Sequence, residues 1–254
     1  MTKNTNSRKP AMAVDSVAHI ATLDMVSATL ERLDARSNGL PGIAVLYGPA
    51  GWGKTFASNT LANETRAYYV QMRSAWRSKT LLEKILAEMG IRHEPTTTAR
   101  LLDMVAEQLS TSHRTLILDE FDYAAKDKNG TLIELTRDIY EASQGSLLLV
   151  GEELLPKKLE RWERFHSRVL TWAPAQAVTL EDAMKLAPIY ASTLEFDADV
   201  LQYLVGIAQG SVRRVCVNLT QLLDYSNTHG LDRITMRHLA ETTVYTGRSP
   251  ERRS

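Results

Sequence analysis

Cysteine is almost absent from this sequence, which excludes an internal disulfide. The single Cys216 lies in an apolar helical pattern with Val212, Val215 and Leu219. That setting favours a small buried side chain over a catalytic thiol. We therefore expect the protein to work in a reducing compartment.

An excess of either charge is also missing. Lysine and arginine together number 30, and aspartate and glutamate together also number 30, so the formal net charge is zero. Neutrality excludes the long-range attraction that draws strongly basic proteins to nucleic acid. A local basic face remains open.

Long apolar runs are the third absence. No apolar stretch approaches the roughly 18 residues of a membrane-spanning helix, and the polar, basic start "MTKNTNSRKP" is followed by no apolar signal core. We therefore expect a soluble, cytoplasmic protein with no membrane association.

Short apolar runs do occur, and they alternate with helical patterns. Strands are expected at 43–48, 67–72, 115–120, 146–151 and 168–172. Helices are expected at 14–33, 54–63, 80–90, 98–109, 131–142 and 153–166. We expect Gly39 to stop the first helix and Thr98 to cap the fourth. Apolar strands alternating with helices predict an α/β fold, a parallel sheet sandwiched by helices.

The pattern changes near residue 175, after which no strand is predicted. Helices are expected near 180–191, 197–208, 211–225 and 235–243, with Thr179, Asp197 and Thr235 as caps. The predicted segments are a disordered basic tail at 1–13, an α/β domain at 14–174, a small all-helical domain at 175–245 and a flexible tail at 246–254.

The segment "LYGPAGWGKT" carries the clearest chemical motif. Gly48, Gly53, Lys54 and Thr55 satisfy G-x-x-x-x-G-K-[ST]. In such loops backbone N–H groups wrap the phosphates of ATP, the lysine reaches the β- and γ-phosphates, and the threonine hydroxyl binds Mg²⁺. The strand before the loop and the helix after it argue against a chance glycine turn. The expected nucleotide contacts are Gly48, Pro49, Ala50, Gly51, Trp52, Gly53, Lys54, Thr55 and Phe56.

The strand "TLILDE" supplies the complement. We expect Asp119 to hold the magnesium and Glu120 to orient and deprotonate an attacking water. The alternative for an Asp-Glu pair is a solvated turn, but this pair directly follows an apolar strand. Glu120 favours hydrolysis by water and disfavours a metabolic P-loop kinase.

With these two motifs the chain resembles the AAA+ ATPases, over roughly residues 15–245. The resemblance implies a helical lid and neighbouring subunits that share each ATP. It also implies an arginine supplied to the neighbour's site, for which "RFHSRV" offers Arg164 or Arg168. A lid arginine is implied within "GSVRRVCVNL", where Arg213 fits better than Arg214. Solvated helix ends are the alternative for all of them.

One position departs from the family pattern. The fourth strand should end in a polar residue that touches the attacking water, and here it ends in Gly151 and Glu152. Either Glu152 does that work or hydrolysis is slow. The departure bears on turnover more than on nucleotide binding.

Within the family, the chain is most similar to the compact ATPases that accompany DNA transposases, typified by the B protein of transposable phage Mu. The segments "LYGPAGWGKT", "LILDEFDYA" and "LLLVGEELL" and the short helical end carry this resemblance. The phage protein also has an N-terminal DNA-binding domain, for which residues 1–40 are too short. Any DNA contact is therefore expected from the ATPase itself.

A basic loop is the local feature that fits such contact. The stretch "QMRSAWRSKT" (71–80) has Arg73, Arg77 and Lys79 and no acid, and Trp76 could stack on a base or wedge beside it. The loop "KDKNG" adds Lys126 and Lys128 on what should be the same face. Solvated loops and a packed tryptophan are the alternatives. Contacts of this kind would be independent of DNA sequence.

The sequence thus predicts an ATPase that uses Mg²⁺ and binds double-stranded DNA without sequence preference. As a homo-oligomeric ring or filament it would deliver target DNA to a transposase, with slow hydrolysis stimulated by DNA or the partner. A helicase-loader ATPase and a protein-directed ATPase switch without a DNA role remain the alternatives.

Overall fold

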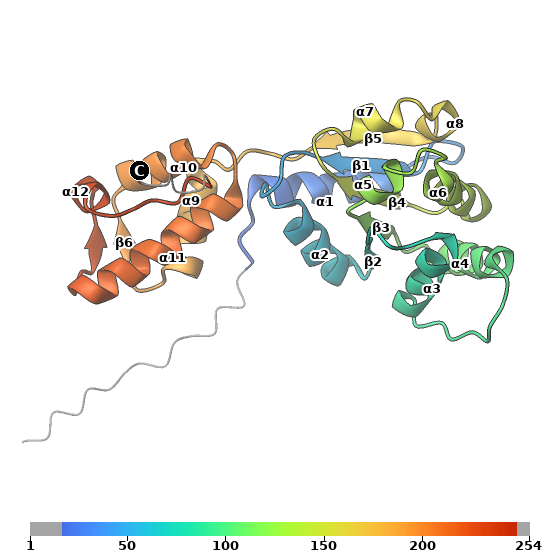
Figure 1. Cartoon of the computed structure of the whole chain (residues 1–254), viewed down its shortest axis with the longest axis horizontal. Coiled ribbons are helices and arrows are strands. Elements are labelled where there is room, and N and C mark those ends of the chain that lie inside the picture. The colour runs from blue at the N-terminus through green and yellow to red at the C-terminus, as the bar shows by residue number, and fades with distance from the viewer. Residues whose placement is uncertain (1–16, 248–254) are drawn as a thin grey trace, which may run out of the picture.

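The computed structural model describes residues 17–247, which form an α/β lobe and a helical lobe joined side by side (Figure 1). The tail expected at 1–13 lies outside the described residues. The same holds for the first three residues of the helix predicted at 14–33 and for 248–254 of the tail predicted at 246–254.

The α/β lobe is built on a five-stranded sheet with the order β2-β3-β4-β1-β5, in which every neighbouring pair is parallel. Its strands are β1 (Ile43–Tyr47), β2 (Tyr68–Gln71), β3 (Leu116–Asp119), β4 (Leu147–Gly151) and β5 (Val169–Pro174). All five strands predicted for this region are confirmed. Apart from Asp119 at the end of β3, the central strands β3 and β4 are apolar, and both are buried throughout because helices cover both faces.

Alternate residues of β1 show how the two faces are covered. Ala44 and Leu46 pack with α1 (Ala21–Asp34) and α2 (Lys54–Thr65). Ile43 and Val45 pack with the helices of the opposite face. Those helices are α3 (Ser78–Glu88), α4 (Thr98–Ser112) and α6 (Thr131–Ser143). The predicted α/β sandwich is therefore confirmed.

The helical lobe follows β5. It contains α9 (Leu180–Tyr190), α10 (Ala198–Ala208), α11 (Val212–His229) and α12 (Met236–Ala240). The prediction that no strand follows residue 175 was wrong, because β6 (Glu195–Phe196) pairs in parallel with β7 (Arg233–Ile234). Two-residue strands are too short to show a period-two pattern in the sequence. Within residues 17–247, no helix has the length and apolar character needed to cross a membrane.

The first helix differs from the prediction at both ends. It begins at Ala21, whose N–H donates to Asp182 Oδ1 at the start of α9 (2.9 Å), and residues 17–20 before it are not helical. It ends at Asp34, well before Gly39, which lies in the following turn. Apolar spacing cannot separate a helix from an extended segment packed against the same core.

Two other predictions needed correction. Thr97, and not Thr98, caps α4, because its side chain accepts a hydrogen bond from the Arg100 N–H. The predicted helix at 153–166 is broken into α7 (Leu155–Leu159) and α8 (Glu163–His166). The break lets Trp162 pack on Gly130, beside the short α5 (Asp122–Ala125).

The caps of the helical lobe were predicted correctly in position. Thr179 and Asp182 form a capping box at α9, and Thr235 caps α12 together with His238. Asp197 occupies the N-cap of α10, but its carboxylate pairs with Arg233 of β7 and makes no cap hydrogen bond.

Candidate active site

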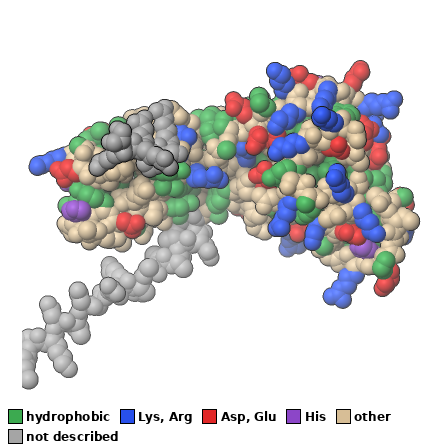
Figure 2. All heavy atoms as spheres, viewed as in Figure 1, with side chains coloured by type: hydrophobic (Ala, Val, Ile, Leu, Met, Phe, Trp, Pro, Cys, Tyr) green, Lys and Arg blue, Asp and Glu red, His purple; other side chains and the backbone are tan. Residues whose placement is uncertain are grey.

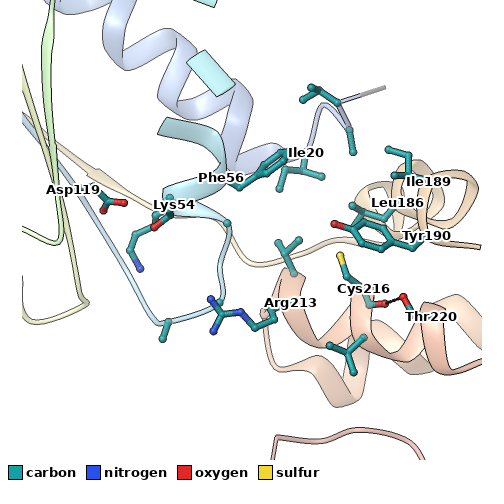
Figure 3. Close-up of a pocket in the computed structure, with 18 of the residues that line it drawn as sticks. Ile20, Lys54, Phe56, Asp119, Leu186, Ile189, Tyr190, Arg213, Cys216 and Thr220 are labelled. Carbon is teal, nitrogen blue, oxygen red and sulfur yellow. Dashed lines mark hydrogen bonds between the residues drawn. The ribbon is translucent and has the colours of Figure 1, made fainter. Parts of the chain in front are cut away.

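A cavity of about 950 Å³ lies where the two lobes meet (Figure 3). One wall is polar and comes from the carboxyl ends of the strands, the loop after β1 and the start of α11. The opposite wall is apolar. In parallel sheets this edge is the usual place for a ligand. The charged side chains that line the cavity are Lys54, Asp119, Glu120, Glu152 and Arg213, and its uncharged polar side chains include Thr55, Thr220 and Gln221.

The loop after β1 forms the floor of the cavity and opens directly into α2, as predicted. Gly51 and Gly53 have φ angles of 85° and 84°. A side chain at Gly51 would also come within 2.6 Å of the Ser211 hydroxyl. The glycines therefore let the loop turn sharply while it touches the helical lobe, and backbone N–H groups at the start of α2 remain available for an anion.

Lys54 curls over this loop. Its Nζ donates to the carbonyl oxygens of Gly48 (2.6 Å) and Pro49 (2.9 Å). Burial lowers the pKa of Lys54, while the carboxylates of Asp119 and Glu120 act in the opposite direction. The ammonium thus lies between the loop and the acid pair, where it could bind a phosphate group.

Asp119 ends β3 almost fully buried, with 2% of its surface exposed. Its Oδ1 accepts the Glu120 N–H (2.8 Å), and its Oδ2 accepts the Tyr69 hydroxyl (2.7 Å). Burial and the neighbouring Asp119 carboxylate raise the pKa of Tyr69, so this hydroxyl remains a donor. The contact from Tyr69 was not foreseen from the sequence.

Glu120 follows in a left-handed backbone conformation, with φ of 58°. This region is uncommon for residues other than glycine. It turns the chain out of the strand while the side chain lines the cavity. Burial and the charge of Asp119 raise the pKa of Glu120 above the ordinary 4.5. A carboxylate of raised basicity beside the cavity suits proton acceptance.

The donor set fits a magnesium ion. Among residues 17–247, no lysine, arginine or histidine forms an ion pair with the buried Asp119. A cation would offset the cost of burying that carboxylate. The Thr55 hydroxyl lies in the first turn of α2 and lines the same cavity. No cluster of three or more metal-binding side chains occurs in the described chain. Proteins hold Mg²⁺ through one or two side chains and the phosphates of a nucleotide, and Thr55 and Asp119 are available for that role.

Gly151, the departure at the end of β4, has a packing reason. A side chain there would collide with the carboxylate of Asp122. The buried Asp122 accepts hydrogen bonds from the Glu152 N–H and from Lys158 Nζ, each at 2.5 Å. The Glu152 side chain is 62% exposed and lies 3.7 Å from Lys158. Asp122 therefore fills the space that a polar residue at Gly151 would occupy, and Glu152 lies at the rim.

Arg213 reaches the cavity from the helical lobe. Its backbone N–H donates to the carbonyl of Gly51 (3.1 Å), which ties α11 to the phosphate loop. Figure 3 shows its guanidinium pointing from α11 toward that loop. Arg214 turns away and donates to Ala208 and Gln209. Arg213 is therefore the better placed of the two to reach a ligand in the cavity, and its role as a lid arginine stays a prediction.

The apolar wall was mostly missed by the sequence interpretation. It is formed by Val17, Ala18, Ile20, Phe56, Leu186, Ile189, Tyr190, Val212, Cys216 and Val217. These residues come from four separate segments, and each looks like an ordinary core residue in its own segment. Phe56 was predicted as a contact, and it is 47% exposed; Val17 (38%) and Tyr190 (40%) on the same wall are exposed as well. Cys216 is half-buried at this wall, and burial raises the pKa of its thiol.

Some predicted loop contacts lie outside the cavity. Ala50, Gly51 and Gly53 line it, whereas Gly48, Pro49 and Trp52 do not. The Trp52 ring instead packs on Gly210, at the turn into α11. The tryptophan thus joins the loop to the helical lobe.

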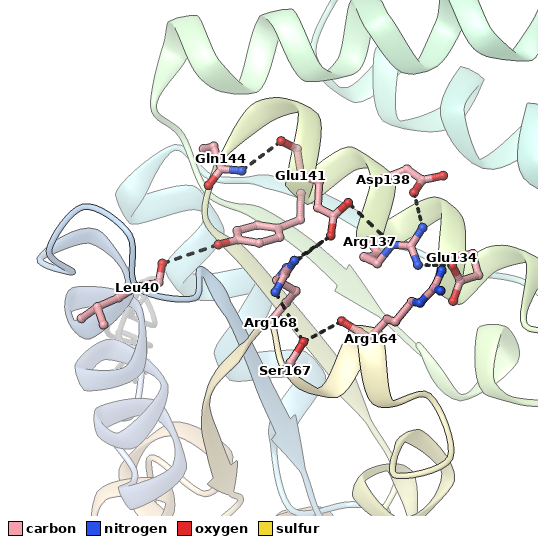
Figure 4. Close-up of polar contacts among 10 residues, drawn as sticks. Leu40, Glu134, Arg137, Asp138, Glu141, Gln144, Arg164, Ser167 and Arg168 are labelled. Atoms are coloured by element: carbon pink, nitrogen blue, oxygen red, sulfur yellow. Dashed lines mark hydrogen bonds and ion pairs between the residues drawn. The ribbon is translucent and has the colours of Figure 1, made fainter.

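Arg164 and Arg168 lie at the other end of the sheet (Figure 4). The Arg168 carbonyl accepts the N–H of Ile43, the first residue of β1, and its guanidinium pairs with Glu141 (3.1 Å). The Arg164 side chain is exposed and points toward α6. Neither residue lines the cavity of its own chain. An arginine that acts on the nucleotide of a neighbouring copy would also lie away from its own cavity.

The two basic loops lie close together. Arg73, Arg77 and Lys79 are exposed, as are Lys126 and Lys128. Hydrogen bonds from Asn129 and Thr131 lower the pKa of Asp127, and the nearby charge of Arg77 adds to the effect. Arg77 of the first loop therefore lies near Asp127 of the second. Basic and acidic side chains are mixed over the visible face of the α/β lobe (Figure 2).

The side chain of Trp76 is more buried than we expect for a tryptophan that stacks on a DNA base. It is partly buried against the core cluster beneath α3. The packed alternative considered for this tryptophan therefore describes its position in the structure.

The sheet order, the phosphate loop, the acid pair and the helical lobe together define a P-loop AAA+ fold. Residues 36–159 match the family model described as an AAA domain. Several solved structures share the fold, and two of them illustrate the likeness. One is the Orc1 protein of Aeropyrum pernix in complex with DNA, with a TM-score of 0.61, 20% identity, and coverage of 91% of this chain and 66% of that one. The other is domain III of the Thermotoga maritima replication initiation protein DnaA, with a TM-score of 0.54, 19% identity, and coverage of 87% and 90%.

Two curated proteins are similar in sequence. Replication factor C subunit 1 of Saccharomyces cerevisiae is 25% identical over 220 residues, which is 80% of this chain and 24% of that protein. The Mu-like prophage FluMu DNA transposition protein B of Haemophilus influenzae is 25% identical over 176 residues, 66% of this chain and 59% of that protein. The chain therefore spans only part of the length of either relative.

Proposed function

We propose that this chain is an ATP-dependent, DNA-binding AAA+ ATPase that delivers target DNA to a transposase. The observation that carries the proposal is the single cavity that joins Lys54, Asp119, Glu120 and Arg213 at the meeting of two lobes. A nucleotide there would contact both lobes at once.

The polar wall would bind and hydrolyse ATP. Backbone N–H groups of the loop and of α2 would hold the phosphates, and Lys54 would exchange its loop carbonyls for phosphate oxygens. Glu120 would orient a water and accept its proton. A magnesium ion, when bound by Thr55 and Asp119, would offset phosphate charge. Glu152 at the rim is available to touch the water.

The helical lobe would act as a lid that senses the nucleotide. Arg213 lines the cavity while its backbone is bonded to the Gly51 carbonyl of the phosphate loop. The lid would correspond to the proposed domain at 175–245, which begins just after β5. ATP binding would therefore alter how the lobes sit against each other.

DNA would bind across the two basic loops. Arg73, Arg77 and Lys79 would contact backbone phosphates, with Lys126 and Lys128 beside them. Such contacts are independent of sequence and weaken with salt. The FluMu relative, a DNA transposition protein by name, supports the link to a transposase.

Assembly would complete the site. Arg168, or Arg164, would reach the nucleotide of a neighbouring copy in a ring or filament. Arg168 would first have to leave Glu141, its partner in the single chain. Slow hydrolysis, stimulated by DNA or by the transposase, would then dissolve the assembly.

Negative-stain microscopy with duplex DNA tests this proposal. Ordered rings or filaments should form with ATP, and neither with ADP nor with Lys54→Ala in ATP. Assemblies that ignore both nucleotide and DNA would refute it. Co-purification with a replicative helicase instead of a transposase would favour a helicase loader. ATP hydrolysis without any DNA binding would favour a protein-directed switch.

A further inference from the structure

The carboxylate of Asp119 is held at both oxygens. The Glu120 N–H donates to Oδ1 at 2.8 Å, and the Tyr69 hydroxyl donates to Oδ2 at 2.7 Å. The first bond comes from the adjacent residue of the chain. The second bond comes from a different element, since Tyr69 lies in β2 and Asp119 in β3. It therefore fixes the plane of the buried carboxylate.

Because of the strand geometry, Tyr69 can reach Asp119 with its hydroxyl and Tyr68 cannot. In the β2–β3 register Tyr69 lies opposite Ile117, and Gln71 lies opposite Asp119. Tyr69 packs on the sheet face that α1 and α2 cover, which is also the face of Thr55. Tyr68 points to the opposite face, where its hydroxyl accepts a hydrogen bond from Gln108 (2.9 Å).

We propose that Tyr69 is a positioning residue of the metal site, whose hydroxyl orients the Asp119 carboxylate toward a nucleotide-bound magnesium ion. The inference rests on the proposed function, because it concerns the metal that would accompany ATP. Hydrogen-bond partners of ligating carboxylates fix the direction of the metal-binding lone pair, and their loss typically costs 10- to 100-fold in metal affinity.

A positioning role differs from a merely structural one in what it affects. Removing the hydroxyl leaves the ring in place, so the packing of β2 against α2 should survive. Binding of nucleotide without metal depends on the loop and Lys54, which Tyr69 does not contact through any hydrogen bond found among the described residues. Only the metal-dependent part of binding should change.

The test uses the full chain with a fluorescent ATP analogue, titrated with Mg²⁺ after metal removal by EDTA. Tyr69→Phe should need about 10-fold more Mg²⁺ for half-maximal enhancement of binding. Its affinity for the analogue in EDTA and its melting temperature should match the wild type. Tyr68→Phe, the matched control on the other face, should keep the wild-type Mg²⁺ dependence.

A double-mutant cycle with Asp119→Asn provides a second measurement of the same Mg²⁺ dependence. If Tyr69 acts through Asp119, then Tyr69→Phe should have no further effect on Mg²⁺ dependence in the Asp119→Asn background. An unchanged or lower Mg²⁺ requirement in Tyr69→Phe would overturn the inference, as would an equal loss of binding in EDTA. A wild-type chain that binds no nucleotide under either condition would instead refute the proposed function and this inference with it.

Discussion

At the scale of single residues, Glu120 is the proposed general base of the candidate site. Its backbone is left-handed, and it directly follows Asp119, the last residue of β3. Residues held in sparsely populated conformations cluster at functional sites. The residue is therefore the most direct place to separate binding from hydrolysis.

Replacing Glu120 with glutamine should leave ATP binding near the wild-type level. The hydrolysis rate should fall by about 10²- to 10⁴-fold, the usual contribution of a general base. Phosphate release and analogue binding measured side by side check this. Glu153→Gln is the matched control, because Glu153 is exposed and does not line the cavity. A normal rate in Glu120→Gln would contradict the role.

The acid limb of the pH–rate profile offers a second residue-scale prediction. Burial and the Asp119 charge raise the pKa of Glu120 above 4.5. A base works when deprotonated, so activity should be full above the raised pKa and fall as the pH drops through it. The limb should therefore lie above pH 4.5 in the wild type and be absent from the residual activity of Glu120→Gln. A wild-type limb at or below 4.5 would count against a perturbed base.

At the scale of elements, the contact between the phosphate loop and the turn into α11 joins the lobes. Trp52 packs on Gly210, and Gly51 accepts the Arg213 N–H. Gly210 has φ of 81°, and a side chain there would collide with the Trp52 ring. The loop and the lid should therefore respond to each other.

Gly210→Ala should destabilise the chain by about 1–3 kcal/mol through overpacking, in addition to its conformational cost. Gly230→Ala is the control, because Gly230 also has positive φ (66°) but no atom lies within 4 Å of an added side chain. Urea unfolding compares the two variants. ATP affinity should fall in Gly210→Ala and not in Gly230→Ala. Equal effects of both variants on stability and affinity would show that the contact does not couple the lobes.

The sequence predicts those elements whose pattern is local. The five main strands and the phosphate loop follow from apolar runs and glycine spacing, and all are present. The break between α7 and α8 could not be predicted in this way. It accompanies the packing of Trp162 on Gly130, which is more than 30 positions away in the chain. The β6–β7 pair is similarly long-range and too short to show a period.

The candidate site divides in the same way. Lys54, Thr55, Asp119 and Glu120 come from two continuous motifs, so their place in one cavity could be predicted. Contacts that cross between elements could not, because no spacing in the sequence reports them. Such contacts are the Tyr69–Asp119 bond, the Asp122–Gly151 packing and the apolar wall shared by Ile20 and Tyr190.

At the scale of the whole molecule, the proposed DNA-binding surface consists of two exposed basic loops on a chain with no formal net charge. Removing Arg73, Arg77 and Lys79 together should weaken DNA binding and leave ATP binding intact. If each side chain contacts one phosphate, the plot of log affinity against log salt concentration should become shallower. Its negative slope should shrink by about 0.9 for each residue removed. Fluorescence anisotropy over a salt series measures it.

The matched control removes Arg92, Arg100 and Arg237, which are exposed and lie outside both basic loops. It changes the net charge by the same three units. An equal loss of DNA binding in the two triple variants would assign the effect to net charge and not to the proposed surface.

In the proposed function, ATP in the cavity controls DNA binding. The most direct test of this control is the affinity of the chain for labelled duplex DNA at one fixed salt concentration, measured with ATP, with ADP and without nucleotide. The wild type should bind at least about 10-fold more tightly with ATP than with ADP, a usual size for coupling between two sites. Lys54→Ala should lose that difference. Equal DNA affinity under all three conditions, or a difference that survives in Lys54→Ala, would contradict the account.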